Sequence, residues 1–120
     1  MHEFSLMASV LEQAEESARA VEALRITSIR LVIGTMSDVL PEAMEFAMEA
    51  LSPGTMAEGS ALSIELRQPR SRCLACGMEF DHDRYHRTCP ACDALSCELI
   101  SGRELYIDFI EVENDAESKQ

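Results

Sequence analysis

The sequence predicts an α+β fold, made of a small three-stranded sheet with two helices and an inserted zinc-ribbon-like module. Two observations support this prediction. Stretches with helical and with strand periodicity alternate along the chain, and two cysteine pairs lie close together in its second half. A chain of 120 residues can form one ordinary core, or a small core plus a module stabilised by a metal. We therefore expect an α/β domain in residues 1–68 and 104–120, with a zinc-binding domain inserted at 69–103.

Two segments have the apolar spacing of helices. Residues 5–24 place apolar side chains on one face and charged side chains on the other, as in a helix that covers a core. A second helix is expected to begin at Pro41, whose fixed φ suits the first helical turn, and to end in the Ser-Pro-Gly sequence at 52–54. The expected apolar face of the first helix consists of Met7, Val10, Leu11, Ala14, Ala18 and Val21.

Four segments have strand character. Residues 26–33 are rich in β-branched side chains, 61–68 alternate between apolar and polar, and a short strand is expected at 97–100. The last strand, 105–112, has apolar residues on both faces, which predicts a central position in the sheet. We expect it to pair antiparallel with 61–68, across a linker at 69–72 that leads into the inserted module.

The two cysteine pairs predict a structural metal site. Each pair has the C-x-x-C spacing, and twelve residues separate the pairs, so that four thiolates can meet around one zinc ion. A C-x-x-C redox motif would stand in a βαβ context, which the flanking sequence does not suggest. Two disulfides are the alternative, and they would require an oxidising compartment. The four candidate ligands are Cys73, Cys76, Cys89 and Cys92.

The N-terminal sequence and the composition favour a reducing compartment. The first residues contain no basic segment followed by an apolar one, and no stretch approaches the ~18 apolar residues of a membrane span. We therefore expect a cytoplasmic protein with reduced thiols. The net charge is −12, and residues 69–103 are neutral, so the excess acid lies elsewhere, where it repels phosphate. A zinc-ribbon module for protein interaction or nucleic-acid binding remains the alternative function.

The first three residues form a second candidate metal site. The amine of Met1, the backbone nitrogen of His2 and its imidazole Nδ1 can close two chelate rings on one ion. A fourth donor can come from the side chain or the amide of Glu3. Nitrogen donors in a plane suit Ni(II) or Cu(II). A histidine at position two is also compatible with an ordinary exposed terminus, and the residues alone leave both interpretations open.

The order of these motifs resembles one family, the HypA/HybF hydrogenase nickel-incorporation proteins. The resemblance covers residues 1 to about 113. It rests on the Met-His-Glu start that opens into a helix, the glycine-to-Pro-Glu stretch at 34–43, the G-T-x-A-E-G turn at 54–59, the two cysteine pairs, and the closing stretch from 102–105 into 110–112.

The resemblance implies a metallochaperone in which Met1, His2 and Glu3 bind nickel and the four cysteines bind structural zinc. It further implies delivery, with a hydrogenase maturation GTPase of the HypB type, to the [NiFe]-hydrogenase large subunit. The sequence contains no nucleotide-binding loop and none of the common hydrolase motifs, so we expect neither an enzyme nor a nucleic-acid partner.

Three further residues remain outside these motifs. Cys97 is a fifth thiol, for which a small buried apolar role is the simplest interpretation. His82 and His86 stand four apart between the cysteine pairs, where they can lie at a solvated hairpin tip or form an additional metal site. A metal-dependent hydrolase using His2, His82 and His86 is a third functional hypothesis, and it requires these residues to converge.

Overall fold

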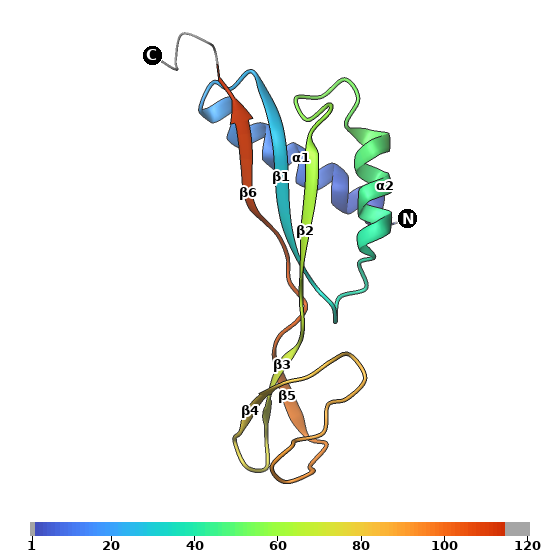
Figure 1. Ribbon diagram of the computed structural model, residues 1–120, viewed down its shortest axis with the longest axis vertical. Coiled ribbons are helices and arrows are strands. Elements are labelled where there is room, and N and C mark those ends of the chain that lie inside the picture. Colours follow the sequence, from blue (N-terminus) through green and yellow to red (C-terminus); the bar gives the residue numbers. More distant parts are fainter. Residues whose placement is uncertain (1, 115–120) are drawn as a thin grey trace. The chain divides into compact units, whose positions relative to one another are not determined.

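The computed structural model describes residues 2–114, and within them the chain forms two helices and two three-stranded sheets. The strand orders are β2-β1-β6 and β4-β3-β5 (Figure 1). This is the α+β fold with an inserted module that the sequence predicts. The elements are α1 (His2–Ala20), β1 (Arg25–Gly34), α2 (Pro41–Leu51), β2 (Ala61–Arg67), β3 (Arg70–Cys73), β4 (Glu79–Asp81), β5 (Cys97–Ser101) and β6 (Leu105–Glu113).

The chain divides into two compact units. One unit consists of Val32–Asp38 and Glu65–Leu105 and contains the whole β4-β3-β5 sheet. The other unit contains both helices and most of the β2-β1-β6 sheet. Within residues 2–114, no helix combines the length and apolar character needed to cross a bilayer.

Helix α1 begins and ends earlier than its sequence pattern predicts. It starts at His2 and ends at Ala20, where the chain turns through Glu22 in the left-handed region, at φ 56°. The N–H of Ala23 then donates to the carbonyl of Ala18 at 3.0 Å, which is the closing bond of a Schellman motif. This early end leaves Val21 60% exposed, so its predicted burial is wrong. The other predicted core residues of the helix are buried.

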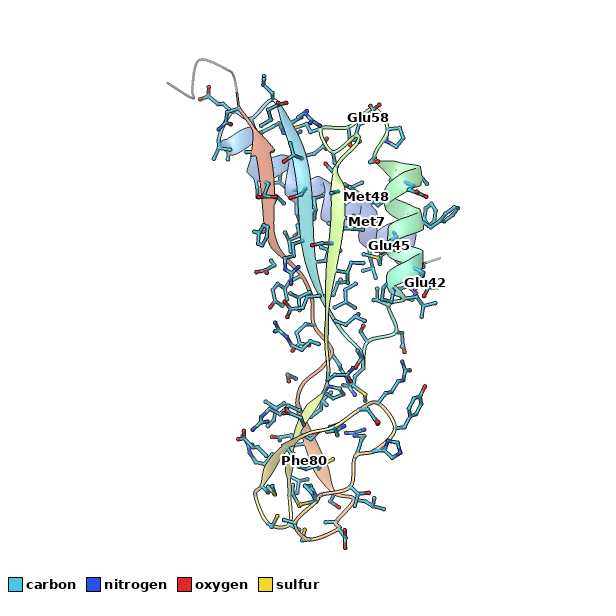
Figure 2. All side chains as sticks on the ribbon, in the orientation of Figure 1. Met7, Glu42, Glu45, Met48, Glu58 and Phe80 are labelled. Atoms are coloured by element: carbon cyan, nitrogen blue, oxygen red, sulfur yellow. The ribbon has the colours of Figure 1, made fainter. Side chains whose placement is uncertain are left out.

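Helix α2 packs against α1 through a face of small and flexible apolar side chains. Met44, Ala47 and Met48 are buried, and Figure 2 labels Met48 together with Met7 of α1. Pro41 occupies the first turn, as predicted, while the preceding residue, Leu40, makes no side-chain cap. The helix termini and the buried methionines therefore follow the sequence pattern closely.

Strand β1 is the centre of its sheet, and β6 lies at an edge. The N–H of Leu24 donates to the carbonyl of Glu113, and that of Gly34 donates to the carbonyl of Glu104, so β1 and β6 run antiparallel. The predictions that 105–112 is central and pairs with 61–68 are both wrong, because β1 separates these strands. Apolar residues on both faces misled the prediction, since Phe109 stays 48% exposed.

Strands β1 and β2 are joined by α2 as a parallel crossover. Near the start of both strands, the hydroxyl of Ser60 donates to the carbonyl of Ile26, and near their ends the N–H of Thr35 donates to the carbonyl of Arg67. Equivalent ends therefore meet, as in a βαβ unit. The chain does contain this motif, but both cysteine pairs lie outside it.

Strand β3 is the centre of the second sheet, whereas its sequence predicts a linker. It pairs antiparallel with β4 and β5, and Ser71 lies opposite Phe80. Arg70 and Arg72 point to one face, where each contacts an acid at 3.5 Å or less on β4, while Ser71 is fully buried on the other. The linker prediction is wrong because this short polar-looking stretch alternates as a strand does. Strand β4 was not predicted.

A close backbone contact leads to a prediction for Gly34. A Cβ added there would lie 2.1 Å from the carbonyl carbon and oxygen of Gly102, so the two backbones would have to move apart. Gly34→Ala should lower the free energy of unfolding by about 3 kcal/mol or more. Urea unfolding followed by circular dichroism measures this loss.

Gly59→Ala is the matched control. Its φ of +78° strains an alanine, but no atom lies within 4 Å of the added Cβ. It should cost only about 1 kcal/mol. Equal losses for the two variants would contradict the close approach of Gly34 to Gly102.

Candidate metal centre

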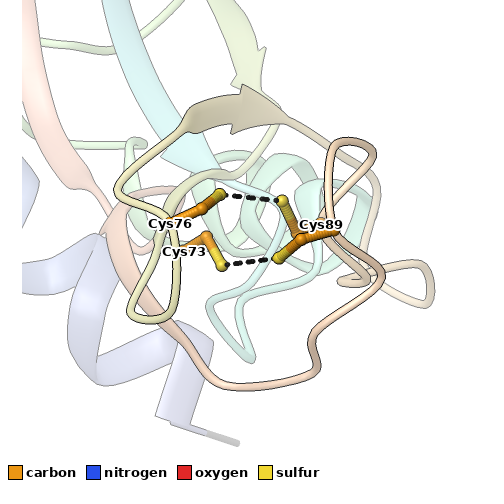
Figure 3. A group of neighbouring side chains, drawn as sticks. Cys73, Cys76 and Cys89 are labelled. Atoms are coloured by element: carbon orange, nitrogen blue, oxygen red, sulfur yellow. Dashed lines mark hydrogen bonds between the residues drawn. The ribbon is translucent and has the colours of Figure 1, made fainter.

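The four paired cysteines come together in one group, which we call the cysteine cluster. All four sulfur atoms lie within 4.8 Å of one another. Figure 3 labels three of these cysteines and shows Cys73 and Cys76 on one loop facing Cys89 on the other. The shortest contacts, both 3.6 Å, join Cys73 Sγ to Cys92 Sγ and Cys76 Sγ to Cys89 Sγ. Cys73 and Cys89 are buried, whereas Cys76 and Cys92 are exposed. Within residues 2–114, no other group of three or more potential ligands is gathered as tightly.

The sulfur geometry suits a tetrahedral cation and not a disulfide. A disulfide requires about 2.05 Å between the sulfurs, and all five cysteines are free thiols. Four sulfurs at ~2.3 Å from a central zinc ion would stand ~3.8 Å apart, close to the observed contacts. Four soft thiolates in a tetrahedron are the donor set typical of structural zinc. The cysteine cluster therefore fits one zinc ion.

The two loops that carry the cluster have the same backbone geometry. After the second cysteine of each pair, the chain turns through the left-handed region, at Gly77 (φ 80°) in one loop and at Asp93 (φ 61°) in the other. The N–H of Gly77 donates to the carbonyl of Cys73 at 2.8 Å, and the N–H of Asp93 donates to the carbonyl of Cys89 at 2.9 Å. Aspartate tolerates this conformation better than most residues. The role of Asp93 was not predicted, although its position after C-x-x-C was the available signal.

Backbone N–H groups act on the sulfurs. The N–H of Ala91 lies 3.4 Å from Cys89 Sγ. Hydrogen bonding by the N–H of Cys76 lowers the pKa of Cys73 to about 7, despite its burial. At Cys92 the N–H of Ala94 acts in the same direction, but neighbouring thiols and burial outweigh it and raise the pKa to about 12. Without a cation the cluster therefore retains protons, which a bound metal would displace.

The two histidines between the cysteine pairs are engaged elsewhere. His82 Nε2 lies 2.7 Å from the hydroxyl of buried Ser71, and its Nδ1 lies 2.7 Å from the carbonyl of Asp83. His86 is largely exposed, and its Nδ1 lies 2.7 Å from the carboxylate of Asp83. His82 is therefore not at a solvated tip, because both ring nitrogens have protein partners. The hydrolase hypothesis loses its basis, since no tight ligand group in residues 2–114 contains a histidine.

Cys97 supports the cluster from outside. It lies opposite Cys73 in the β3–β5 register and packs against the small core of Cys73, Phe80 and Cys89. Its thiol donates to the carbonyl of Arg87 at 3.5 Å. This partly buried position agrees with its expected role as a small apolar side chain.

At the amino terminus the structure brings two of the three predicted nickel donors together. His2 Nε2 lies 3.6 Å from a carboxylate oxygen of Glu3, and the His2 side chain is 54% exposed while that of Glu3 is 10% exposed. Met1 lies outside the described residues. Since His2 is the first residue of α1, its amide precedes the helical hydrogen-bond ladder and needs no carbonyl partner.

The Glu3 carboxylate also contacts the start of α2. It accepts a hydrogen bond from the N–H of Leu40 at 3.3 Å, a contact that sequence reasoning missed because the two residues are far apart in the chain. Its own backbone N–H is the largest influence that holds the pKa of Glu3 below its ordinary value, and the N–H of Leu40 acts in the same direction. Glu3 is therefore an ionised, largely buried group that links the two helices.

Comparisons with known proteins agree with this geometry. The family model described as "Hydrogenase/urease nickel incorporation, metallochaperone, hypA" matches residues 1–112. The chain is 42% identical over 113 residues to the hydrogenase maturation factor HypA of Geobacter metallireducens, covering 94% of this chain and all of the relative. It is 38% identical over 117 residues to HypA of Chlorobium luteolum, covering 98% and 100%.

Solved structures of the family have the same fold. The solution structure of the Ni metallochaperone HypA from Helicobacter pylori superposes with a TM-score of 0.67 at 21% identity, covering 94% of this chain and 98% of that one. A second solution structure of a HypA protein gives a TM-score of 0.73, also at 21% identity, with 96% and 98% coverage. The near-complete family match and the curated relatives together assign the chain to the HypA family of hydrogenase nickel-incorporation metallochaperones.

Proposed function

We propose that this protein takes up Ni(II) at its amino terminus and delivers it to the [NiFe]-hydrogenase large subunit, together with a HypB-type maturation GTPase. Membership in a nickel-incorporation family supports the cargo. The main observation in favour of this nickel site is the position of His2. It is the first residue of α1, and its imidazole is exposed beside the Glu3 carboxylate. The sequence has no nucleotide-binding loop, so a partner must supply any nucleotide-driven step.

The proposed nickel donors are Met1, His2 and Glu3. The Met1 amine, the His2 amide nitrogen and the His2 imidazole would form a planar nitrogen set, which suits Ni(II). Because the Glu3 carboxylate is held by the N–H of Leu40, we propose that it orients His2 through its negative charge. A fourth donor would come from the Glu3 side chain or its amide, since the hydrogen bond to Leu40 uses only one carboxylate oxygen.

The four cysteines would hold a structural zinc ion in a zinc-binding domain spanning about residues 69–103. Four thiolates fill every tetrahedral position, so such an ion offers no open site for water or cargo. Zinc would supply folding energy to a module whose own apolar core is small. The alternative of a nucleic-acid module finds no support in a chain with a net charge of −12.

Removal of one thiol should abolish zinc binding. We expect Cys76→Ser to lose zinc and to unfold the module, because zinc binding in such sites contributes about 10–16 kcal/mol to folding. Helices α1 and α2 should persist, since their shared core contains no cysteine. Elemental analysis and far-ultraviolet circular dichroism measure both effects. Cys97→Ser is the control and should keep about one zinc per chain; full zinc retention by Cys76→Ser would refute the four-thiolate site.

Nickel binding should require a free amino terminus and His2. Acetylation of the terminus and His2→Ala should each weaken nickel binding by more than about 100-fold. Loss of a residue that only hydrogen-bonds to a metal ligand costs up to about 100-fold in affinity, and loss of the ligand itself should cost more. Calorimetric titration of untagged protein measures the affinity, and zinc content should not change. His86→Ala removes an exposed imidazole outside the proposed site and should bind nickel normally. Unchanged affinity in both altered proteins would exclude this terminal site.

Nickel affinity should decrease as the pH is lowered. Amine and imidazole donors must lose their protons to bind a metal, so protons compete with nickel as the pH falls. The decline should extend from about pH 8 to about pH 6, where terminal amines and imidazoles take up protons. Because the pKa of Glu3 is lowered, chiefly by its own N–H, its carboxylate stays ionised throughout and adds no slope. Nickel isotherms across this range test the prediction, and a flat profile would exclude nitrogen donors.

A further inference from the structure

An apolar patch is exposed where α1 and α2 begin. The ring of Phe46 on α2 meets the ring of Phe4 on α1 edge-to-face, with centroids 5.9 Å apart and planes at 63°, yet Phe46 is 62% exposed. Leu40 is also 62% exposed, and its N–H is bound by Glu3, the neighbour of Phe4. Exposed aromatic and aliphatic side chains that gather in this way favour contact with another protein.

Acidic side chains surround this patch. Glu42 and Glu49 stand four residues before and three residues after Phe46, so they share its side of α2, and Glu45 precedes it directly. All three are exposed, and Figure 2 shows Glu42 and Glu45 on α2. We call Phe4, Leu40 and Phe46 with these three glutamates the α2 patch.

Nothing in the described part of this unit neutralises the α2 patch. Residues 39–64 contain no lysine or arginine. The three arginines in residues 2–31 form ion pairs with acids outside the patch: Arg19 with Glu15, Arg25 with Glu113, and Arg30 with Asp108. The patch therefore combines an apolar centre with a negative rim.

The charge of the rim selects the occupant. Nucleic acid and anionic lipid carry negative charge and would be repelled. A second copy of this chain would bring the same glutamates face to face in a symmetric contact, which costs energy. The complementary surface is that of a protein with apolar side chains inside a ring of lysines and arginines.

The α2 patch is continuous with the proposed nickel donors. The Glu3 carboxylate lies 3.6 Å from His2 Nε2 and 3.3 Å from the Leu40 nitrogen. A protein that covers Leu40 and moves the start of α2 would change the hydrogen bonding of Glu3 and thereby the position of His2. The contacts of Leu40 with Glu3 and of Glu3 with His2 thus connect a partner docked on the patch to the proposed nickel donors.

We propose that the maturation GTPase docks on the α2 patch through a basic surface with an apolar centre, and that this contact acts on the nickel site through Leu40 and Glu3. This inference rests on the proposed function, which supplies the GTPase as partner. It adds the surface, the chemistry of the contact and its connection to the metal donors.

Two substitutions and two matched controls test the docking surface. Binding of the purified GTPase from the same organism is measured by calorimetry for full-length, zinc-loaded protein. Glu45→Lys and Phe46→Ala should each weaken binding about 10-fold or more, because one reverses a rim charge and the other removes the central ring. Glu16→Lys lies about 18 Å from Phe4 along α1, by the rise of the helix, and Leu24→Ala truncates another exposed side chain; both should bind normally.

Nickel affinity and salt dependence separate the possible outcomes. Both patch variants should retain nickel affinity within about two-fold, and Glu45→Lys should reduce the salt dependence of GTPase binding. If wild-type protein binds the GTPase and all four variants bind equally well, the docking surface is overturned while the partnership stands. If wild-type protein does not bind the GTPase, both the partnership and the docking surface are overturned. If the control Glu16→Lys loses as much GTPase affinity as Glu45→Lys, the loss reflects the net charge of the protein and not the α2 patch. This result would also overturn the docking surface.

Discussion

The inserted module depends on the convergence of its four cysteines. Its sheet consists of three strands of three to five residues, and its buried apolar core is limited to Cys73, Phe80 and Cys89 with two partly buried neighbours. So few apolar side chains cannot offset the entropy of ordering the long loops between the strands. A cation shared by the two C-x-x-C loops would supply the missing cross-link. The equivalent left-handed turns at Gly77 and Asp93 give the two loops the same backbone geometry, and the two sulfurs of each loop meet in one cluster.

The helical unit addresses a different problem, namely how to hold in place the terminus that we propose as the nickel site. Chain ends are usually frayed. Here α1 begins at the second residue, and the carboxylate of Glu3 bonds to the N–H of Leu40 at the start of α2. The two helices also pack against each other, with Met7 of α1 and Met44 of α2 both fully buried. Glu3 is therefore fixed in place by a contact with the start of α2, although it lies in the first turn of α1.

Local patterns in the sequence predicted local structure well. Periodicity identified both helices, the central strand and the buried methionines, and the C-x-x-C spacing identified the cysteine cluster before its geometry was known. Strand neighbours could not be predicted, because the order β2-β1-β6 depends on which apolar faces meet in space. The strand at Arg70–Cys73 was missed because it is short and polar, and its pairing and ion pairs with β4 and β5 exist only after the sheet forms. The contact of Glu3 with Leu40 was missed for the same reason, since 37 positions separate the two residues.

The ion pairs on β3 also determine the long-range electrostatic field of this face of the module. Arg72 is shared between Glu79 and Glu98, and Arg70 between Glu79 and Asp81. Two positive and three negative charges at such close range nearly cancel, and salt screens the remainder beyond about 8 Å. An approaching molecule therefore feels little force from this face, and diffusional encounter is directed by the uncompensated carboxylates of the helices. This face of the β4-β3-β5 sheet therefore adds little to the long-range electrostatic field of the protein.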